Sequence, residues 1–359
     1  MRQLKTLFTA CLVLLASATL SAQDIHFSQF YMSPLNLNPA MTGVMNCNIR
    51  LAANYRNQWA SVLRSNSFRT YSVSYDQKIP AGRYDYFGIG GTFWGDRAGE
   101  ADFATLTGKL SASYSKKMGG YRDKAHYLVV GAEGGVAQRS IDFLNLRWGT
   151  QHDGAGGFDP TAPSQEGDFN RDNFLFADLA AGLLWFTVFD QYSNFYVGGA
   201  FHHLNRANQS FVDPTSPAAQ DGGFEEDLIY SRYTIHAGGE FRMNERVALV
   251  PGAIYMAQGP SFQLNAGTSF KFLLGNARDR QSFQIGIWGR IASELDQGFL
   301  TDAAILSTRF DFNDLSLGFS YDINISPLQP ASNGQGSFEF GLVYKICGMQ
   351  RRGVYCPEF

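Results

Sequence analysis

Two segments of this 359-residue chain combine acidic and aromatic side chains that could bind a cation or a protein. Residues 152–172 contain five carboxylates and two phenylalanines, and residues 213–227 contain five carboxylates and one phenylalanine. Clustered carboxylate oxygens beside glycines could bind calcium. Phenylalanines among acids, with few lysines, are instead typical of a surface that docks a protein. We expect docking, with structural calcium as the alternative and no other cofactor or metal. The candidate residues are Phe158, Asp159, Phe169, Phe211, Asp213, Phe224, Glu225 and Glu226.

A polar segment near the N-terminus, residues 36–43, is the second candidate site. It is unsuited to a strand, because Pro39 holds the residue before it extended and Gly43 permits a tight turn. Two interpretations are open: the segment contacts partner proteins, or it is a packed plug. The candidate binding residues are Asn38, Pro39, Ala40 and Gly43.

The remaining polar residues form no catalytic or metal-binding pattern. His202 and His203 are adjacent in an expected strand, so we expect their side chains on opposite faces, where they cannot share a metal ion. No serine has the glycine context of a hydrolase nucleophile. Residues 88–91 are glycine-rich but lie inside an expected strand, which argues against a phosphate-binding loop. We therefore expect no enzymatic activity.

The elements that position these residues are strands with one apolar and one polar face. Between Ala104 and Ser115, alanine, leucine, glycine and tyrosine alternate with threonine, serine and lysine. Successive strand residues point to opposite faces, so the pattern fits either a soluble sandwich or an outer-membrane barrel with a polar lumen. The same alternation recurs in four other segments: 69–76, 232–242, 262–272 and 315–324.

The N-terminus favours the barrel. Arg2 and Lys5 precede an apolar run that ends before Ser21 and Ala22, which is the pattern of a cleaved secretory signal. Cleavage after Ala22 changes the net charge from −3 to −5, because two basic residues are removed. No later apolar stretch approaches the roughly 20 residues that a spanning helix needs.

Composition supports the same conclusion. The chain has 30 phenylalanines, 17 tyrosines and 38 glycines, while only 17% of its residues are charged. Aromatic girdles and glycines in curved strands account for these counts in a barrel. The mildly acidic balance and the lack of a basic stripe argue against a nucleic-acid partner.

We predict an all-β fold, a single antiparallel transmembrane β-barrel of about 14 strands. Both termini of such barrels face the periplasm, so long outer loops alternate with short inner turns. This places the long connections 139–173 and 204–228 outside and the short connections 243–246 and 312–314 inside. The expected strands are 48–57, 67–77, 85–95, 102–116, 126–138, 174–187, 194–203, 229–242, 247–257, 261–273, 282–291, 300–311, 315–325 and 337–346.

The expected domains are a signal peptide at 1–22, a periplasmic N-terminal lead at 23–47, the barrel at 48–346 and a periplasmic tail at 347–359. Charged residues of both signs fall on the lumenal phase of the strands. A paired network that fills the lumen and a selective pore are both open interpretations. The lumenal set is Arg50, Arg56, Asp178, Arg232, Glu240, Arg242, Lys271, Glu339 and Lys345.

Three cysteines follow the signal peptide, and one disulfide is expected in the oxidising periplasm. Closing the barrel brings Cys47, before the first strand, near Cys347, after the last. Cys356 could compete for either partner, and the sequence leaves this pairing open.

Short motifs along the whole mature chain resemble the PorP/SprF family of the type IX secretion and gliding apparatus. They start with Gln23-Asp24 and His26-Phe27-Ser28-Gln29-Phe30-Tyr31, followed by Asn38-Pro39-Ala40 with Gly43, then Tyr55-Arg56-Asn57-Gln58-Trp59. Further matches are residues 201–205, 236–239, 320–322 and Cys356-Pro357 with Phe359. Arg206 departs from the pattern, because a proline is expected after it and Ala207 stands there.

The resemblance implies a non-enzymatic outer-membrane protein that works with that apparatus. It would help to export, retain or anchor a specific cell-surface protein, such as an adhesin. The implied partners are this exported protein, periplasmic components of the machinery and outer-membrane lipid. A passive outer-membrane solute channel is the alternative function, and a hydrolase is a third possibility for which the residues give no triad.

Overall fold

The computed structural model describes residues 24–120, 124–152, 157–159, 161–163, 171–190, 192–213, 227–275, 281–293, 298–327, 329–348 and 356–357. The expected signal peptide, 1–22, and most of the expected tail lie outside these residues. No helix within them is both long and apolar enough to cross a membrane.

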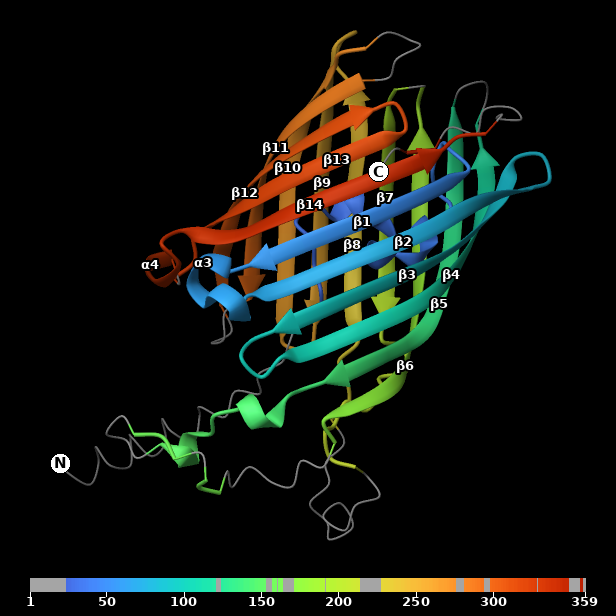
Figure 1. The fold of residues 1–359 in the computed structure, drawn as a ribbon. Coiled ribbons are helices and arrows are strands. Elements are labelled where there is room, and N and C mark those ends of the chain that lie inside the picture. Colours follow the sequence, from blue (N-terminus) through green and yellow to red (C-terminus); the bar gives the residue numbers. More distant parts are fainter. Residues whose placement is uncertain are drawn as a thin grey trace, which may run out of the picture.

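The described residues form 14 antiparallel strands in one closed barrel (Figure 1). Each strand pairs with its neighbours in sequence, and the first pairs with the last from Ile49↔Ile346 to Gln58↔Ser337. The strands are β1 (Ile49–Gln58), β2 (Phe68–Ala81), β3 (Asp85–Ala98), β4 (Phe103–Gly119), β5 (Ala125–Ser140), β6 (Asn173–Val188), β7 (Asn194–His202), β8 (Arg232–Arg242), β9 (Val247–Gln258), β10 (Ser261–Leu273), β11 (Gln281–Ser293), β12 (Phe299–Phe312), β13 (Leu315–Asn324) and β14 (Gln335–Ile346).

The predicted fold class and strand order are confirmed. Boundaries differ by a few residues, most clearly in β2, which continues to Ala81 instead of ending at residue 77. Pro80 lies in this extension of the strand. It is tolerated because it lies near the strand end, where a missing backbone N–H costs little.

The two faces of the wall differ as the alternation predicts. In β4, Leu110 points outward and is 77% exposed, whereas Thr107 and Ser111 point into the lumen and are buried. An apolar outer face with a polar interior is the arrangement of a transmembrane barrel.

The helical elements are all short. Three precede the barrel: η1 (Phe30–Met32), α2 (Pro34–Leu37) and η2 (Pro39–Met41). The others lie in connections: α3 (Ala60–Leu63), η3 (Arg64–Asn66), η4 (Phe143–Asn145), η5 (Gly149–Gln151) and α4 (Gln329–Ser332).

The barrel has two unlike ends. Connections that follow odd-numbered strands lie at one end, which we call the loop end. It includes the long β5–β6 and β7–β8 connections, together with α3 and α4 (Figure 1). Connections that follow even-numbered strands lie at the other end, the turn end, and include Met243–Arg246 and Asn313–Asp314. Long and short connections therefore separate as the sequence predicts.

Residues 24–47, which we call the lead, run through the lumen from the loop end to the turn end. Asp24 contacts His203 and Arg232 beside the loop-end limits of β7 and β8, whereas Cys47 lies at the turn end before β1. The dark blue segment is visible inside the wall in Figure 1. This differs from the expected periplasmic lead. The physical reason is apolar content, because burial of apolar side chains is favourable and the lead has six that are buried: Phe27, Phe30, Met32, Leu35, Leu37 and Met41.

Candidate functional site

The inner wall is shaped to the lead by glycines on its lumenal face. A Cβ added at Gly131 of β5 would lie 2.5 Å from the Ala40 nitrogen and from the Pro39 carbonyl oxygen. A Cβ at Gly182 of β6 would overlap the Asn38 side chain, and one at Gly88 of β3 would overlap the Thr42 carbonyl. These glycines are therefore needed for close approach of the lead, in addition to any role in strand curvature.

Asn38 fastens the middle of the lead to three strands. Its side-chain amide lies 3.0 Å from the Leu183 carbonyl oxygen, 3.2 Å from that of Gly199 and 3.0 Å from His236 Nε2. Its Oδ1 accepts a bond of 2.9 Å from the Ala40 N–H, which caps η2. The side chain is 0% exposed.

All four candidate residues of the lead are buried inside the barrel. Pro39 and Ala40 pack against the wall with Asn38, and the Gly43 N–H donates to Asp76 at 2.7 Å. Asp76 also pairs with Arg50, whose guanidinium reaches the carbonyl of Met41. A periplasmic protein cannot touch these side chains while the lead is seated, so the structure supports the plug interpretation.

A buried ionic cluster holds the start of the lead at Ser28. Glu339 accepts bonds from the backbone N–H groups of Ser28, at 2.6 Å, and Gln29, at 2.9 Å. Asp322 accepts the Ser28 hydroxyl at 3.0 Å, while Arg56 and Arg290 donate to that hydroxyl and pair with the carboxylates. Such a cluster is tolerable in the interior only because each charge has a partner.

A second ionic cluster lies nearer the loop end. Lys109 pairs with Glu133 at 3.0 Å and with Asp178 at 2.7 Å. His203 bridges Asp178, at 2.9 Å, and Asp24 of the lead, at 2.6 Å. The lead therefore completes a network that begins in the wall.

The prediction that His202 and His203 face opposite sides is wrong. Strand β7 ends at His202, and His203 has a φ of 55°, which turns its side chain back into the lumen. Both rings are buried. Neither belongs to a metal-like cluster. Among the described residues, the one group with metal-ligand spacing is Cys47, Asp314 and Cys347, and a disulfide occupies its two sulfurs.

Seven of the nine predicted lumenal charges form ion pairs inside the barrel, which favours the paired network over the selective pore. The other two, Arg242 and Lys345, are half-buried, and the Arg242 guanidinium donates to backbone carbonyls of the β8–β9 turn. Arg50, Arg56, Asp178, Arg232, Lys271 and Glu339 are buried, and Lys271 pairs with Glu240 at 2.9 Å. Two pockets beside the lead, around His26 and around Tyr31, have cavity volumes of about 20 and 30 Å³. Each has room for only one or two water molecules.

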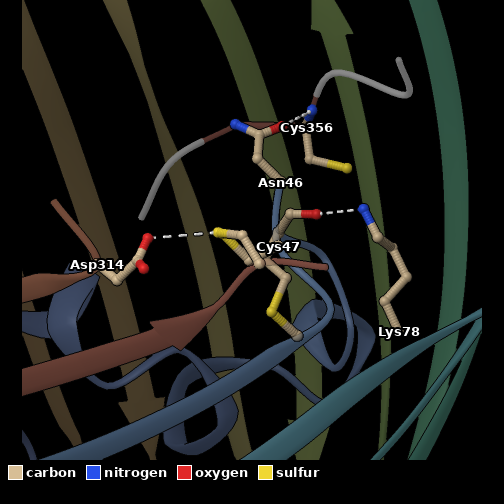
Figure 2. The surroundings of a disulfide bond; sticks show 7 residues. Asn46, Cys47, Lys78, Asp314 and Cys356 are labelled. Carbon is tan, nitrogen blue, oxygen red and sulfur yellow. Dashed lines mark hydrogen bonds between the residues drawn. A yellow bond between two sulfur atoms is a disulfide. The ribbon is translucent and has the colours of Figure 1, made fainter. Parts of the chain in front are cut away.

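The lead is tied to the barrel closure by a disulfide at the turn end. Cys47 and Cys347 are joined, so the end of the lead is bonded to the chain just after β14. Cys356 is a free, buried thiol whose sulfur lies 3.4 Å from the Tyr86 hydroxyl. Its backbone N–H donates to the Asn46 side chain at 2.6 Å, next to the disulfide (Figure 2).

The two long connections join at Phe211. Its ring centroid lies 5.1 Å from that of Phe174, 5.7 Å from Phe143 and 6.3 Å from Phe103, and its carbonyl accepts the Arg171 N–H. Phe211 thus acts inside an aromatic cluster rather than on an open surface, because it packs the β7–β8 connection onto the β5–β6 connection.

Other candidates in these connections are exposed. Phe158 is 36% exposed, with the Arg147 guanidinium 5.3 Å from its ring. The neighbouring Asp159 accepts the backbone N–H and hydroxyl of Thr161, which lowers the pKa of its carboxyl group. Leu144, at 95% exposure, was not singled out from the sequence, because no periodic pattern marks a lone leucine in a loop. Asp213 is partly buried, and Phe169, Phe224, Glu225 and Glu226 lie outside the described residues.

The solved structures that are similar to this chain have low sequence identity to it. The toluene transporter TbuX of Ralstonia pickettii is 10% identical, with a TM-score of 0.43, over 88% of this chain and 93% of that one. A Pseudomonas aeruginosa FadL homologue is 11% identical, with a TM-score of 0.40, over 86% and 92%. The translocator domain of the autotransporter NalP of Neisseria meningitidis is 12% identical, with a TM-score of 0.35, over 89% and 96%.

Sequence families give the more specific result. No curated protein matches the chain. The family model described as type IX secretion system membrane protein PorP/SprF matches residues 19–344, which include the lead and nearly all of the barrel. The chain therefore belongs to the PorP/SprF family of type IX secretion system membrane proteins.

Proposed function

We propose that this protein is a plugged, non-enzymatic barrel of the outer membrane that retains or hands over a specific exported surface protein. The observation that carries the proposal is the seated lead. It fills the lumen with buried side chains, bonds to the wall at Ser28, Asn38 and Gly43, and leaves cavities of about 20 and 30 Å³ beside it. A lead seated in this way would obstruct the passage of solutes, so we assign the function to the rims of the barrel.

The loop end is the side that we assign to the exported protein. Its two long connections form one unit through Phe211, and this unit presents exposed apolar side chains, Leu144 and Phe158, next to carboxylates such as Asp159. Apolar and aromatic groups with a polar surround are the usual chemistry of a protein interface. A passive porin would not need long connections with exposed apolar and acidic side chains. Their presence therefore supports docking of a protein over permeation of solutes.

The turn end is the side that we assign to periplasmic components of the secretion machinery. Asn38 and Pro39 would affect binding there only indirectly. They hold the lead in place, and the lead ends at Cys47 at the turn end. A direct contact would use the short turns and the region around the disulfide instead.

Quantitative proteomics of the cell surface tests this function. A strain carrying Leu144→Ser with Phe158→Ser, and strains lacking 158–169 or 214–225, should assemble the barrel, because exposed loops tolerate change. Each should hold less of one exported surface protein. The matched control is Val62→Ser, which removes an apolar side chain of 44% exposure from the α3 connection at the same end.

Two outcomes would contradict the proposal. Normal levels of every surface protein in the deletion strains would exclude the long connections as the docking surface. Reduced uptake of small solutes with an unchanged surface proteome would favour the passive channel.

A further inference from the structure

Basic side chains gather where β2–β5 reach the turn end. In β4, Leu110, Tyr114 and Lys116 all point outward. The Lys116 side chain therefore lies where the apolar outer face ends. Arg83 lies in the β2–β3 turn, and Lys117 and Lys124 lie at the neighbouring ends of β4 and β5. With Asp85, these four basic residues have a net charge of +3, and we call them the turn-end basic patch.

Two of the cations converge on one aromatic ring. The Lys117 ammonium lies 4.3 Å and the Arg83 guanidinium carbon 5.2 Å from the centroid of the Tyr84 ring. A cation–π contact positions a cation without neutralising its charge. In the part of the chain that the structure describes, neither side chain pairs with a carboxylate.

The one carboxylate in the patch is already used. Asp85 accepts the Lys116 ammonium at 2.8 Å, the Tyr114 hydroxyl at 2.9 Å and the Lys117 backbone N–H at 2.9 Å. It therefore organises the strand ends and leaves the charge of the Arg83 and Lys117 side chains available to an external anion.

Apolar side chains continue from the patch along the outer wall. Phe87 and Tyr114 face outward with ring centroids 4.9 Å apart, and Met118 is exposed beyond them. At the loop end of the same strands, Arg97 is instead paired with Asp102. In the patch, by contrast, the side chains of Arg83 and Lys117 have no carboxylate partner among the described residues, and they lie next to an apolar outer wall.

We propose that the turn-end basic patch binds the phosphate head group of an anionic phospholipid, between Arg83 and Lys117, with the acyl chains along Phe87 and Tyr114. In the orientation given under the proposed function, this lipid belongs to the inner leaflet. The site itself does not depend on which surface protein the loops bind. Its effect is to fix the height of β2–β5 in the membrane and to favour anionic lipid there.

Native mass spectrometry of the full mature protein in detergent tests the site by titration with phosphatidylglycerol or phosphatidylcholine. The wild-type protein should bind phosphatidylglycerol more tightly than phosphatidylcholine. The double variant Arg83→Gln with Lys117→Gln should weaken phosphatidylglycerol binding by about 30-fold. Each basic residue near a membrane surface contributes about 1 kcal/mol to the binding of anionic lipid, and two residues are removed. Binding of phosphatidylcholine should change little.

The matched control is Arg69→Gln with Arg97→Gln, which removes two exposed positive charges from the loop end of neighbouring strands. It should retain phosphatidylglycerol as the wild type does. The proposal is overturned if the control loses as much lipid as the test variant, or if the wild type does not distinguish the two lipids. If the wild type retained inorganic phosphate as well as it retains phosphatidylglycerol, the patch would be a site for a free anion, and the lipid proposal would also be overturned.

Discussion

Substituting Gly182 by alanine tests whether the lead is seated as the structure places it. The added Cβ would lie 3.0 Å from the Asn38 Cγ and 3.2 Å from the Pro39 Cδ, and it would overlap Asn38 Oδ1. Asn38 cannot move away alone, because its amide is held by β6, β7 and β8. The lead must therefore shift as a unit.

The expected cost is that of overpacking a filled interior, about 1–3 kcal/mol. Loss of the Asn38 bonds to the Leu183 and Gly199 carbonyls would add about 1 kcal/mol each, so we expect a total of about 3 kcal/mol or more. Denaturant unfolding in lipid vesicles, followed by tryptophan fluorescence, measures this change. Single-channel recording in planar bilayers should show rare openings in the variant and a closed wild type.

The control is Gly199→Ala in the adjacent strand β7. Gly199 is opposite Leu183, one residue from Gly182, but a Cβ there would meet only the Thr234 carbonyl oxygen, at an ordinary 3.5 Å. It should cost less than about 0.5 kcal/mol, because the added methyl group would meet no atom at less than ordinary contact distance and the Gly199 carbonyl could still accept the Asn38 bond. If the two variants unfolded at the same denaturant concentration, the lead would not be packed against β6 and the plug interpretation would fail.

Three further predictions concern the ends of the barrel. Cysteine introduced at Leu144 should react with a membrane-impermeant maleimide on intact cells and cysteine at Asn244 should not; the reverse pattern would invert the orientation. Replacing Cys47 and Cys347 by serine should lower stability by about 2–5 kcal/mol, whereas Cys356→Ser should leave the disulfide intact, and peptide mapping of the wild type would expose any other pairing. Removing calcium with EGTA should leave the melting temperature and the rate of loop proteolysis unchanged, since the Asp159 carboxylate already accepts the Thr161 hydroxyl; a lower melting temperature or faster loop proteolysis would assign structural calcium to the long connections.

The barrel could be predicted because each strand carries its own evidence. The alternation in β4 separates Leu110 from Ser111 without reference to any other strand, and the lengths of the connections fix the phase of the whole chain. The nearness of Cys47 and Cys347 follows from closure of the barrel. These features depend on local periodicity, which a single sequence records.

The position of the lead could not be derived in this way. Its apolar residues require burial, but whether the lumen can accept them depends on wall shape, which is distributed over many strands. One signal was available: Gly88, Gly131 and Gly182 fall on the lumenal phase, where polar side chains would otherwise fill the barrel. The position of His203 was missed for a different reason, because the strand ends one residue earlier than the alternation suggests.

The seated lead also explains why the interior carries so much charge without being a pore. Arg56, Arg290, Asp322 and Glu339 lie on separate strands and would leave polar space at the centre if they were alone. The backbone N–H groups and hydroxyl at Ser28 enter that space and give both carboxylates further donors. The charged side chains of the lumen therefore bind the backbone of the lead, and they are not evidence of an ion channel. Since the lead continues directly into β1 and is bonded to the chain after β14, displacing it would strain the seam that closes the barrel. A barrel built in this way is suited to hold its lumen closed.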